Sequence, residues 1–375
     1  MKLVASVLIT AGVLYTVHAG GMKLIPEKGD FGSVHWSALL IYMPTLLGMT
    51  WFRSVRWRYL LNPIVQIPKT RLLAVSSVGF LAILLLPFRL GELARPYLIK
   101  TRPARPTDRG PERDPQGRRP DDRKPGKPVL TMTAATSSVV AERVIDGLFL
   151  SIVLAIALLT VPTLDPLPDK VVGLPITVAH VRLMGFAMLG LFSVAFTTIA
   201  VFYFARAWAV RATEVVIGLV SKKLAGKLAG IATHLADGLH VFSRGRDFFG
   251  FLLETAIYWG FNAVGMWLLA YACGVTHADG SAITFGEACT LMGMLGCTIL
   301  IPGPPGLLGV FQAGIYAGMT MYFPTAIVTG SGSAYVFLLY TTQVLLIIVM
   351  AIWGLWYEGG TRRLQGALDV ASEAT

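Results

Sequence analysis

Three ionisable residues, Arg89, Glu92 and Arg95, follow one another at intervals of three, directly after the apolar residues 72–86. If helical, they share a face, and each arginine can pair with Glu92 across about one turn. Two guanidinium groups held by a carboxylate suit a phosphate ester, because arginine offers planar, bidentate donors. Gly91 would let such a ligand approach the backbone closely. We interpret these residues as a phosphate-binding motif; alternatively, Arg95 only extends toward a surface.

A second charged motif, Glu142, Arg143 and Asp146, opens another apolar segment. The two carboxylates lie on one helical face at i and i+4, and Arg143 reaches Asp146 at i, i+3. Charges in an apolar helix need partners. We expect the carboxylates to hold the arginines of the phosphate-binding motif and to leave net positive charge toward a cavity. A purely structural pair of Arg143 and Asp146 that locks two helices is an open alternative.

A third motif, residues 301–312, interrupts an apolar stretch with prolines and glycines. Irregular backbone inside a membrane is tolerated only in protein or beside a wet cavity. The N–H groups from residue 307 onward would form a helix N-terminus that attracts an anion. The alternative is a tight turn between two full spans. The residues that we interpret as a gate are Pro302, Gly303, Pro305, Gly306, Gly309 and Gln312.

The composition is that of a polytopic membrane protein. Of the 375 residues, 54% are hydrophobic and 14% are charged, and the mean hydropathy is +0.64. The net charge of +11 is spread over segments between apolar stretches, which favours membrane orientation over nucleic-acid binding. The three cysteines and six histidines have no metal-ligand spacing. We expect no metal and no cofactor.

The elements that must position these motifs are membrane helices, which need ~20 apolar residues each. The first apolar segment has no cleavage site, so we expect a retained helix and not a signal peptide. Three other segments are shorter or interrupted, at 72–88, 283–301 and 307–323. Six segments are long enough to span, at 3–19, 36–52, 139–161, 183–204, 248–272 and 335–356.

The distribution of Lys and Arg predicts how the shorter segments lie. Both flanks of residues 72–88 are basic, and basic flanks remain cytoplasmic. We therefore expect a re-entrant hairpin from the cytoplasmic side, with residues 57–67 as its other limb. Residues 283–323 would form a second hairpin that enters from outside. The fold class is thus an all-α polytopic membrane protein with about six spans and two opposed hairpins, an inverted repeat with both termini in the cytoplasm.

The domain organisation follows from these segments. A Pro-rich, charged stretch without large apolar residues predicts a disordered insert, and apolar residues at helical spacing beside lysines predict an amphipathic surface helix. The divisions are 1–100 (first membrane repeat), 101–128 (basic insert), 129–205 (two spans), 206–247 (cytoplasmic amphipathic segment), 248–358 (second repeat) and 359–375 (cytoplasmic tail).

At its three motifs the chain resembles the transmembrane region of lysylphosphatidylglycerol synthases, a family of flippase-like membrane proteins. The resemblance implies lipid translocation, since in the synthases this region flips the aminoacylated lipid. The family continues with Arg-Glu where this chain has Phe311 and Gln312, so a charged pair is absent. Because the sequence ends at Thr375, we expect no aminoacyl transfer from it. The matching residues are Arg89-Leu90-Gly91-Glu92, Arg95-Pro96, Glu142-Arg143, Asp146 and Gly306-Leu307-Leu308-Gly309-Val310.

These observations predict a flippase or carrier in the bacterial cytoplasmic membrane that moves an anionic phospholipid or a lipid-linked headgroup. Its partners would be lipids and the bilayer, with a homo-oligomer left open and no nucleic acid. Two other classes remain open. One is an intramembrane enzyme or accessory subunit of glycolipid or phospholipid synthesis with Glu92 or Asp146 as general base; the other is a scaffold without lipid turnover.

Overall fold

The computed structural model describes residues 23–62, 64–86, 91–100, 132–168, 177–204, 211, 245–299 and 304–359. Within these ranges the chain is helical, as expected, and a β-bridge joins Thr276 to Ala282. In chain order the elements are η1 (Lys28–Phe31), η2 (Trp36–Ala38), α2 (Leu39–Val55), α3 (Arg58–Leu61), α4 (Lys69–Leu85), α5 (Ala94–Lys100), α6 (Met132–Thr160), α7 (Val178–Phe204), α10 (Gly245–Ala272), α11 (Phe285–Ile299), η6 (Pro305–Leu307), α12 (Val310–Met319), α13 (Thr325–Thr329) and α14 (Ser331–Glu358).

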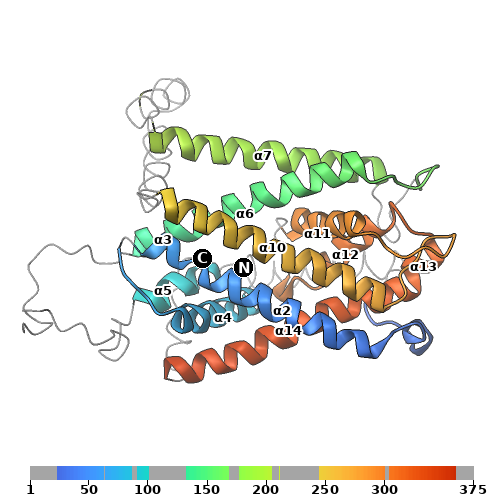
Figure 1. Ribbon diagram of the computed structural model, residues 1–375, viewed down its shortest axis with the longest axis horizontal. Coiled ribbons are helices and arrows are strands. Elements are labelled where there is room, and N and C mark those ends of the chain that lie inside the picture. Colours follow the sequence, from blue (N-terminus) through green and yellow to red (C-terminus); the bar gives the residue numbers. More distant parts are fainter. Residues whose placement is uncertain are drawn as a thin grey trace, which may run out of the picture.

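The long helices run roughly along the long axis of the molecule (Figure 1). α2 packs on α10, α4 packs on α14, and α6 packs on α7 and α11. The shorter helices gather at opposite ends: α3, α4 and α5 lie at the left end of the view, whereas α11, α12 and α13 lie at the right (Figure 1). The long helices therefore join two different clusters of short ones.

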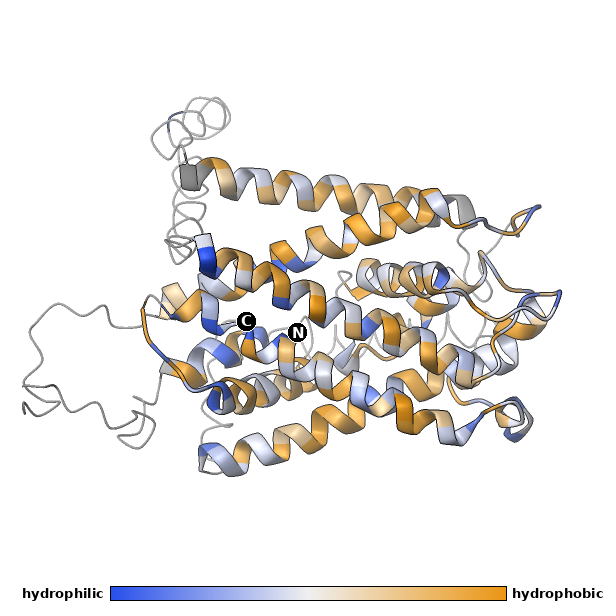
Figure 2. Ribbon diagram, viewed as in Figure 1, coloured by the Kyte–Doolittle hydropathy of each residue, from blue (hydrophilic) through white to orange (hydrophobic). Residues whose placement is uncertain are grey.

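Apolar residues make up much of each long helix (Figure 2). Large hydrophobic side chains such as Leu40, Leu159 and Ile352 are well exposed, which a lipid-facing surface requires. In the described part of the chain, two helical segments are long and apolar enough to cross a membrane, Ala134–Thr160 and Ser331–Glu358. Helices also cover the expected spans 36–52, 183–204 and 248–272. The span at 3–19 lies outside the described residues, and the six-span arrangement stays a prediction.

The first short hairpin consists of α4 and α5, which pack against each other. α4 ends at Leu85, shortly before Pro87, because a residue that precedes proline disfavours the helical conformation. The prediction of residues 57–67 as the other limb is wrong: the helix there, α3, has only 4 residues. The return limb is α5 instead, because α5 packs on α4. A longer α3 is disfavoured by the prolines that follow it in the sequence, at positions 63 and 68.

The second hairpin consists of α11 and α12, whose long mutual contact agrees with the expected pairing. α11 has 15 residues and α12 has 10, fewer than the ~20 that a helix needs to cross the hydrocarbon. These lengths favour two short helices over the alternative of a tight turn between two full spans. Irregular backbone separates the helices, and within its described part Gly306 and Leu307 have positive φ angles of 71° and 55°.

The two hairpins meet inside the molecule. The 3-10 turn η6, which precedes α12, packs against α4. A Cβ added to Gly306 would lie 3.8 Å from Leu84, near the end of α4. The Tyr340 hydroxyl of α14 donates a 2.8 Å hydrogen bond to the Gly306 carbonyl. The described part of the irregular backbone therefore packs against α4 and α14, with Pro305 exposed and residues 306–308 half-buried.

Two hydrophobic clusters support this arrangement. The larger joins α2, α10, α11, α12 and α14, and the smaller joins α3, α4, α5 and α6, with Trp57 at its centre and fully buried. The charged groups described next lie beside the smaller cluster. Of the expected non-membrane segments, the insert at 101–128 and most of 206–247 and 359–375 lie outside the described residues.

Candidate functional site

Arg56 is the most tightly bound cation of the site. It follows the last residue of α2, and its side chain is fully buried. Nη1 and Nη2 each donate a 2.6 Å hydrogen bond to one carboxylate oxygen of Asp146. Nη1 also donates to the Thr255 hydroxyl of α10 at 2.8 Å. This bidentate geometry fixes both the distance and the orientation of α2, α6 and α10 relative to one another.

Glu142 is the central acceptor of the site. Its carboxylate is 0% exposed and accepts hydrogen bonds from Arg56 at 3.0 Å, from Arg95 at 3.1 Å and from Arg143 at 2.8 Å. One carboxylate therefore serves three guanidinium groups. A buried carboxylate needs this degree of compensation, since its desolvation costs several kcal/mol.

Arg95 enters the site from α5 and is held more loosely than Arg56. Its guanidinium lies 4.3 Å from the centre of the Trp57 ring and 5.6 Å from that of Phe80. The side chain is only 1% exposed, yet Nε and Nη2 have no hydrogen-bond partner. Only Nη1 is engaged, by Glu142. Arg95 thus has an oriented guanidinium with buried donors to spare, and such donors are costly unless an acceptor meets them.

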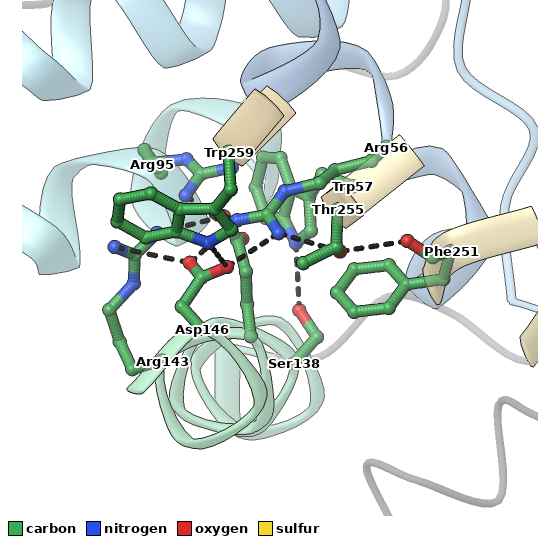
Figure 3. Close-up of polar contacts among 10 residues, drawn as sticks. Arg56, Trp57, Arg95, Ser138, Arg143, Asp146, Phe251, Thr255 and Trp259 are labelled. Carbon is green, nitrogen blue, oxygen red and sulfur yellow. Dashed lines mark hydrogen bonds and ion pairs between the residues drawn. The ribbon is translucent and has the colours of Figure 1, made fainter. Parts of the chain in front are cut away.

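Polar side chains of α6 and α10 point toward Arg56 from two sides (Figure 3). On α10, Thr255 and Trp259 are one turn apart, and Trp259 Nε1 donates to Asp146 at 3.4 Å. On α6, Ser138, Glu142 and Asp146 are spaced by four residues, so the 3.6-residue repeat places them on one face. Ser138 accepts a 3.0 Å hydrogen bond from the Trp57 indole. These three residues of α6 therefore bind side chains from the end of α2, from α5 and from α10.

The site carries an excess of positive charge. Glu142 experiences the charges of four arginines, at positions 53, 56, 95 and 143. Glu92, half-buried in a 3-10 turn before α5, acts electrostatically on Arg143. Among the described residues this makes four cationic and three anionic side chains, so one unit of positive charge is not balanced within the cluster. An anionic ligand would balance it.

The structure brings together part of the predicted phosphate-binding motif. The expected contact between the two charged motifs is present as the Arg95–Glu142 pair. Arg89 lies outside the described residues. Glu92 and Arg95 do not lie on one continuous α-helix as expected, because Glu92 is in a 3-10 turn and α5 begins at Ala94.

Gly91 lies directly against the backbone of α4 and not beside an open cavity. A Cβ added there would lie 2.1 Å from the carbonyl carbon of Ala82 in α4. Because Gly91 has no side chain, the 3-10 turn that leads into α5 packs backbone to backbone on α4. The approach of a ligand to the Gly91 backbone stays a prediction; the close approach that the structure shows is to α4.

The structure contains an ion pair that locks two helices, but it is not the Arg143–Asp146 pair considered as the alternative for the second motif. Arg143 approaches Asp146 at 3.6 Å, but both belong to α6, so this pair joins no two helices. The pair that locks helices is Arg56–Asp146. Arg143 keeps 23% of its side chain exposed, unlike Arg56.

The predicted gate is only partly described. Pro302 and Gly303 lie outside the described residues, whereas Pro305 and Gly306 form η6. The Gly309 N–H donates to the Gln312 side chain at 2.7 Å, and the Leu307 N–H donates to the Pro304 carbonyl. Both groups were expected to be free for an anion. The Gly309 N–H is occupied because the side chain of Gln312, the third residue of α12, caps the helix. The Leu307 N–H is occupied by the backbone of the 3-10 turn η6.

Sequence reasoning missed Arg56, Arg53, Thr255 and Trp259. Arg56 and Arg53 were counted only as basic residues on the cytoplasmic flank of a span. A signal was available: Glu142 and Asp146 outnumber Arg143 within their own motif, and a second cation was required nearby. Nothing in the sequence chose Arg56 over its basic neighbours. Among the described residues, no cluster of His, Cys, Asp or Glu could hold a metal ion.

A comparison with models of protein families shows to which family the chain belongs. Residues 3–354 match the family model for the lysylphosphatidylglycerol synthase TM region. The chain belongs to the lysylphosphatidylglycerol synthase transmembrane-region family. No curated protein and no solved structure matches the chain. Membership of this family indicates a membrane protein of lipid metabolism or transport, consistent with the apolar helices of the structure.

Proposed function

We propose that this member of the family is a lipid flippase that moves an anionic phospholipid or a lipid-linked headgroup between the membrane leaflets. The observation that carries the proposal is Arg95, a buried guanidinium with Nε and Nη2 left without partners. A phosphate group offers acceptor oxygens in the geometry that a guanidinium prefers. The excess positive charge of the cluster supports the same ligand.

The substrate-binding set of this proposal divides into two roles. Arg95, together with Arg89, contacts the phosphate, and Arg143 is the partly exposed cation beside Arg95. Glu92, Glu142 and Asp146 orient these arginines, and Gly91 lets α5 carry Arg95 close to α4. A cation held by carboxylates rather than left free keeps its orientation when the ligand leaves.

The meeting of the two hairpins supports a transport role for the same region. In transporters with inverted repeats, sites lie where broken helices from the two repeats meet near the membrane midplane. Here η6 packs on α4, whose hairpin partner α5 carries Arg95. Rearrangement of this contact would open the arginine cluster to one side or the other. The proposed gate is the segment that includes Pro302, Gly303, Pro305, Gly306, Gly309 and Gln312.

The test is leaflet redistribution of fluorescent phosphatidylglycerol and phosphatidylcholine in proteoliposomes. Arg95→Gln removes the positive charge, whereas Arg95→Lys keeps the charge but loses the bidentate donor geometry of the guanidinium group. Arg58→Gln serves as the control. Arg58 pairs with Glu254 at the same end of the molecule, outside the cluster. We expect phosphatidylglycerol movement to be lost in Arg95→Gln, weakened in Arg95→Lys and kept in the control.

Mass analysis of the lipids separates the flippase from an enzyme. A flippase changes only the distribution of a lipid, so the masses stay constant. A new lipid mass that depends on Asp146 or Glu92 would replace the proposal by the intramembrane enzyme. Movement that is equal in wild type and Arg95→Gln would remove the role of Arg95.

A further inference from the structure

A groove opens on the flank of the molecule between α2, α4 and α14. Its outer part has a volume of about 340 Å³, the size of a small-ligand pocket. It is lined by Leu47, Gly48, Thr50 and Trp51 of α2, by Leu73 of α4 and by Met350 of α14. The lining is almost wholly apolar. Because α14 is one of the two segments able to cross a membrane, the groove opens toward the hydrocarbon.

The groove continues inward into a narrower pocket of about 30 Å³ that shares Thr50 and Met350 with the outer part. Its lining stays mainly apolar there but gains three polar side chains. Arg53, Ser77 and Gln343 contribute to the lining, one from each of the three helices. The groove therefore has an apolar outer part and an inner end where a cation and two neutral polar side chains join the lining, the order that a phospholipid tail and headgroup require.

Arg53 is the charged group at the inner end. In the part of the chain that the structure describes it makes no ion pair, and its buried Nε has no hydrogen-bond partner. Its guanidinium lies 4.1 Å from the centre of the Phe80 ring, which orients it without neutralising it. Phe80 also contacts Arg95, so one aromatic ring connects the groove with the arginine cluster.

We infer that this groove holds one acyl chain of an anionic phospholipid, with the lipid phosphate at Arg53. The inference rests on the proposed function and specifies where the lipid approaches the arginine cluster. The apolar lining at the depth of a spanning helix fits an acyl chain, and the unpaired cation fits a phosphate. Hydrocarbon tails are as apolar as leucine, so the groove itself discriminates little among lipids. Preference for one lipid over another must come from Arg53.

The experiment uses the full chain in nanodiscs that contain phosphatidylglycerol or phosphatidylcholine with a photoactivatable diazirine on one acyl chain. Cross-linked peptides are mapped by mass spectrometry. We expect labels at residues 47–51 and at Met350, about tenfold more from phosphatidylglycerol than from phosphatidylcholine. Both lipids carry the phosphate, but the choline ammonium of phosphatidylcholine would lie beside the Arg53 guanidinium and repel it. The Arg53→Gln variant should lose this preference, and Arg53→Lys should keep most of it.

A matched pair on α14 tests the groove itself. Met350→Trp fills the mouth, whereas Leu345→Trp adds the same ring to the outer face, where Leu345 is 55% exposed and outside both linings. Only Met350→Trp should abolish labelling at 47–51. Equal labelling by both lipids, or labels that persist in Met350→Trp, would overturn the inference.

The same variants separate this inference from the proposed function. If wild-type protein is labelled in the groove with the expected preference but moves no lipid between leaflets, the groove stands and the flippase fails. If lipid moves but the labels fall elsewhere on the protein, the flippase stands and the groove fails. Arg53→Gln can be judged in either case, because its readout is the lipid preference of labelling and not transport.

Discussion

Arg56 and Asp146 are 90 positions apart in the chain and are joined by two parallel hydrogen bonds of 2.6 Å. The pair is almost free of solvent, with side-chain exposures of 0% and 7%. It connects the end of α2 to the middle of the apolar helix α6. A buried bidentate pair of this kind fixes the helices that carry the neighbouring, less fully bound arginines.

Asp146→Ala should destabilise the protein strongly. It leaves the Arg56 guanidinium buried with fewer acceptors, and breaking a buried pair costs ~3–5 kcal/mol. Thermal unfolding in detergent measures the loss. Glu254→Ala is the control, since it breaks the Arg58–Glu254 pair, whose side chains keep 18% and 13% of their surface exposed. We expect a smaller loss there, because Arg58 can turn toward solvent when its partner is removed. Equal losses in the two variants would contradict a structural role for the Arg56–Asp146 pair.

Arg95→Ala should cost less stability than Arg56→Ala. Without Arg95, Glu142 keeps its hydrogen bonds to Arg56 and Arg143, and two unpaired buried donors disappear. We expect a loss of ~1–3 kcal/mol for Arg95→Ala against ~3–5 for Arg56→Ala. Lipid movement should nevertheless vanish in Arg95→Ala. A variant that unfolds as readily as Arg56→Ala would show that Arg95 is mainly structural.

Gly91→Ala should force the first hairpin apart. The added methyl group would meet the α4 backbone at Ala82 at 2.1 Å, and neither backbone can move aside without displacing Arg95. We expect a destabilisation of ~1–3 kcal/mol, as for other overpacked sites. Gly260→Ala in α10 is the matched control, because nothing lies within 4 Å of the added Cβ. There alanine should be neutral or stabilising by up to ~1 kcal/mol.

Tyr340→Phe should loosen the irregular segment before α12. The variant removes the hydroxyl that donates to the Gly306 carbonyl at 2.8 Å, a loss of ~0.5–1.5 kcal/mol. Faster amide hydrogen exchange in residues 304–312 would report it. Tyr271→Phe, at a tyrosine that is 58% exposed on α10, should leave the exchange there unchanged. Unaltered exchange in Tyr340→Phe would mean that packing alone holds the segment.

Acid should release η1 from α14. Partial burial raises the pKa of Asp30, but hydrogen bonds from the Lys23 ammonium and the Glu27 N–H lower it further, so its pKa is below the usual value. Asp30 also accepts a hydrogen bond from Ser333 of α14. A depressed pKa contributes stability that is present above about pH 4 and is lost as the pH falls through the folded value.

The measurement is hydrogen exchange of residues 28–38 from about pH 6 to about pH 3, corrected for intrinsic rates. Protection should fall at the acid end in wild type. In Asp30→Asn it should be lower throughout and should change less with pH. An unchanged wild-type profile would mean that this contact adds no stability to the segment.

Composition and hydrophobic periodicity determined the helical class, the positions of α2, α6, α7, α10 and α14, and the second hairpin. These are local properties, because a long apolar run in a membrane has few alternatives to a helix. Glu142, Asp146 and Arg95 could also be recognised from the sequence, since charges in an apolar segment require a reason.

Tertiary structure alone decided which groups meet. Arg53, Arg56 and Arg58 are similar basic residues in sequence, yet Arg56 is buried against Asp146, Arg58 pairs with Glu254, and Arg53 faces a groove. Their directions depend on how α2 ends and how α6 and α10 pack beside it, which no local pattern encodes. The pairing of α5 with α4 through Gly91 is likewise a property of two backbones in contact. Ion pairs across a fold are chosen by geometry, and geometry appears only when the helices are packed.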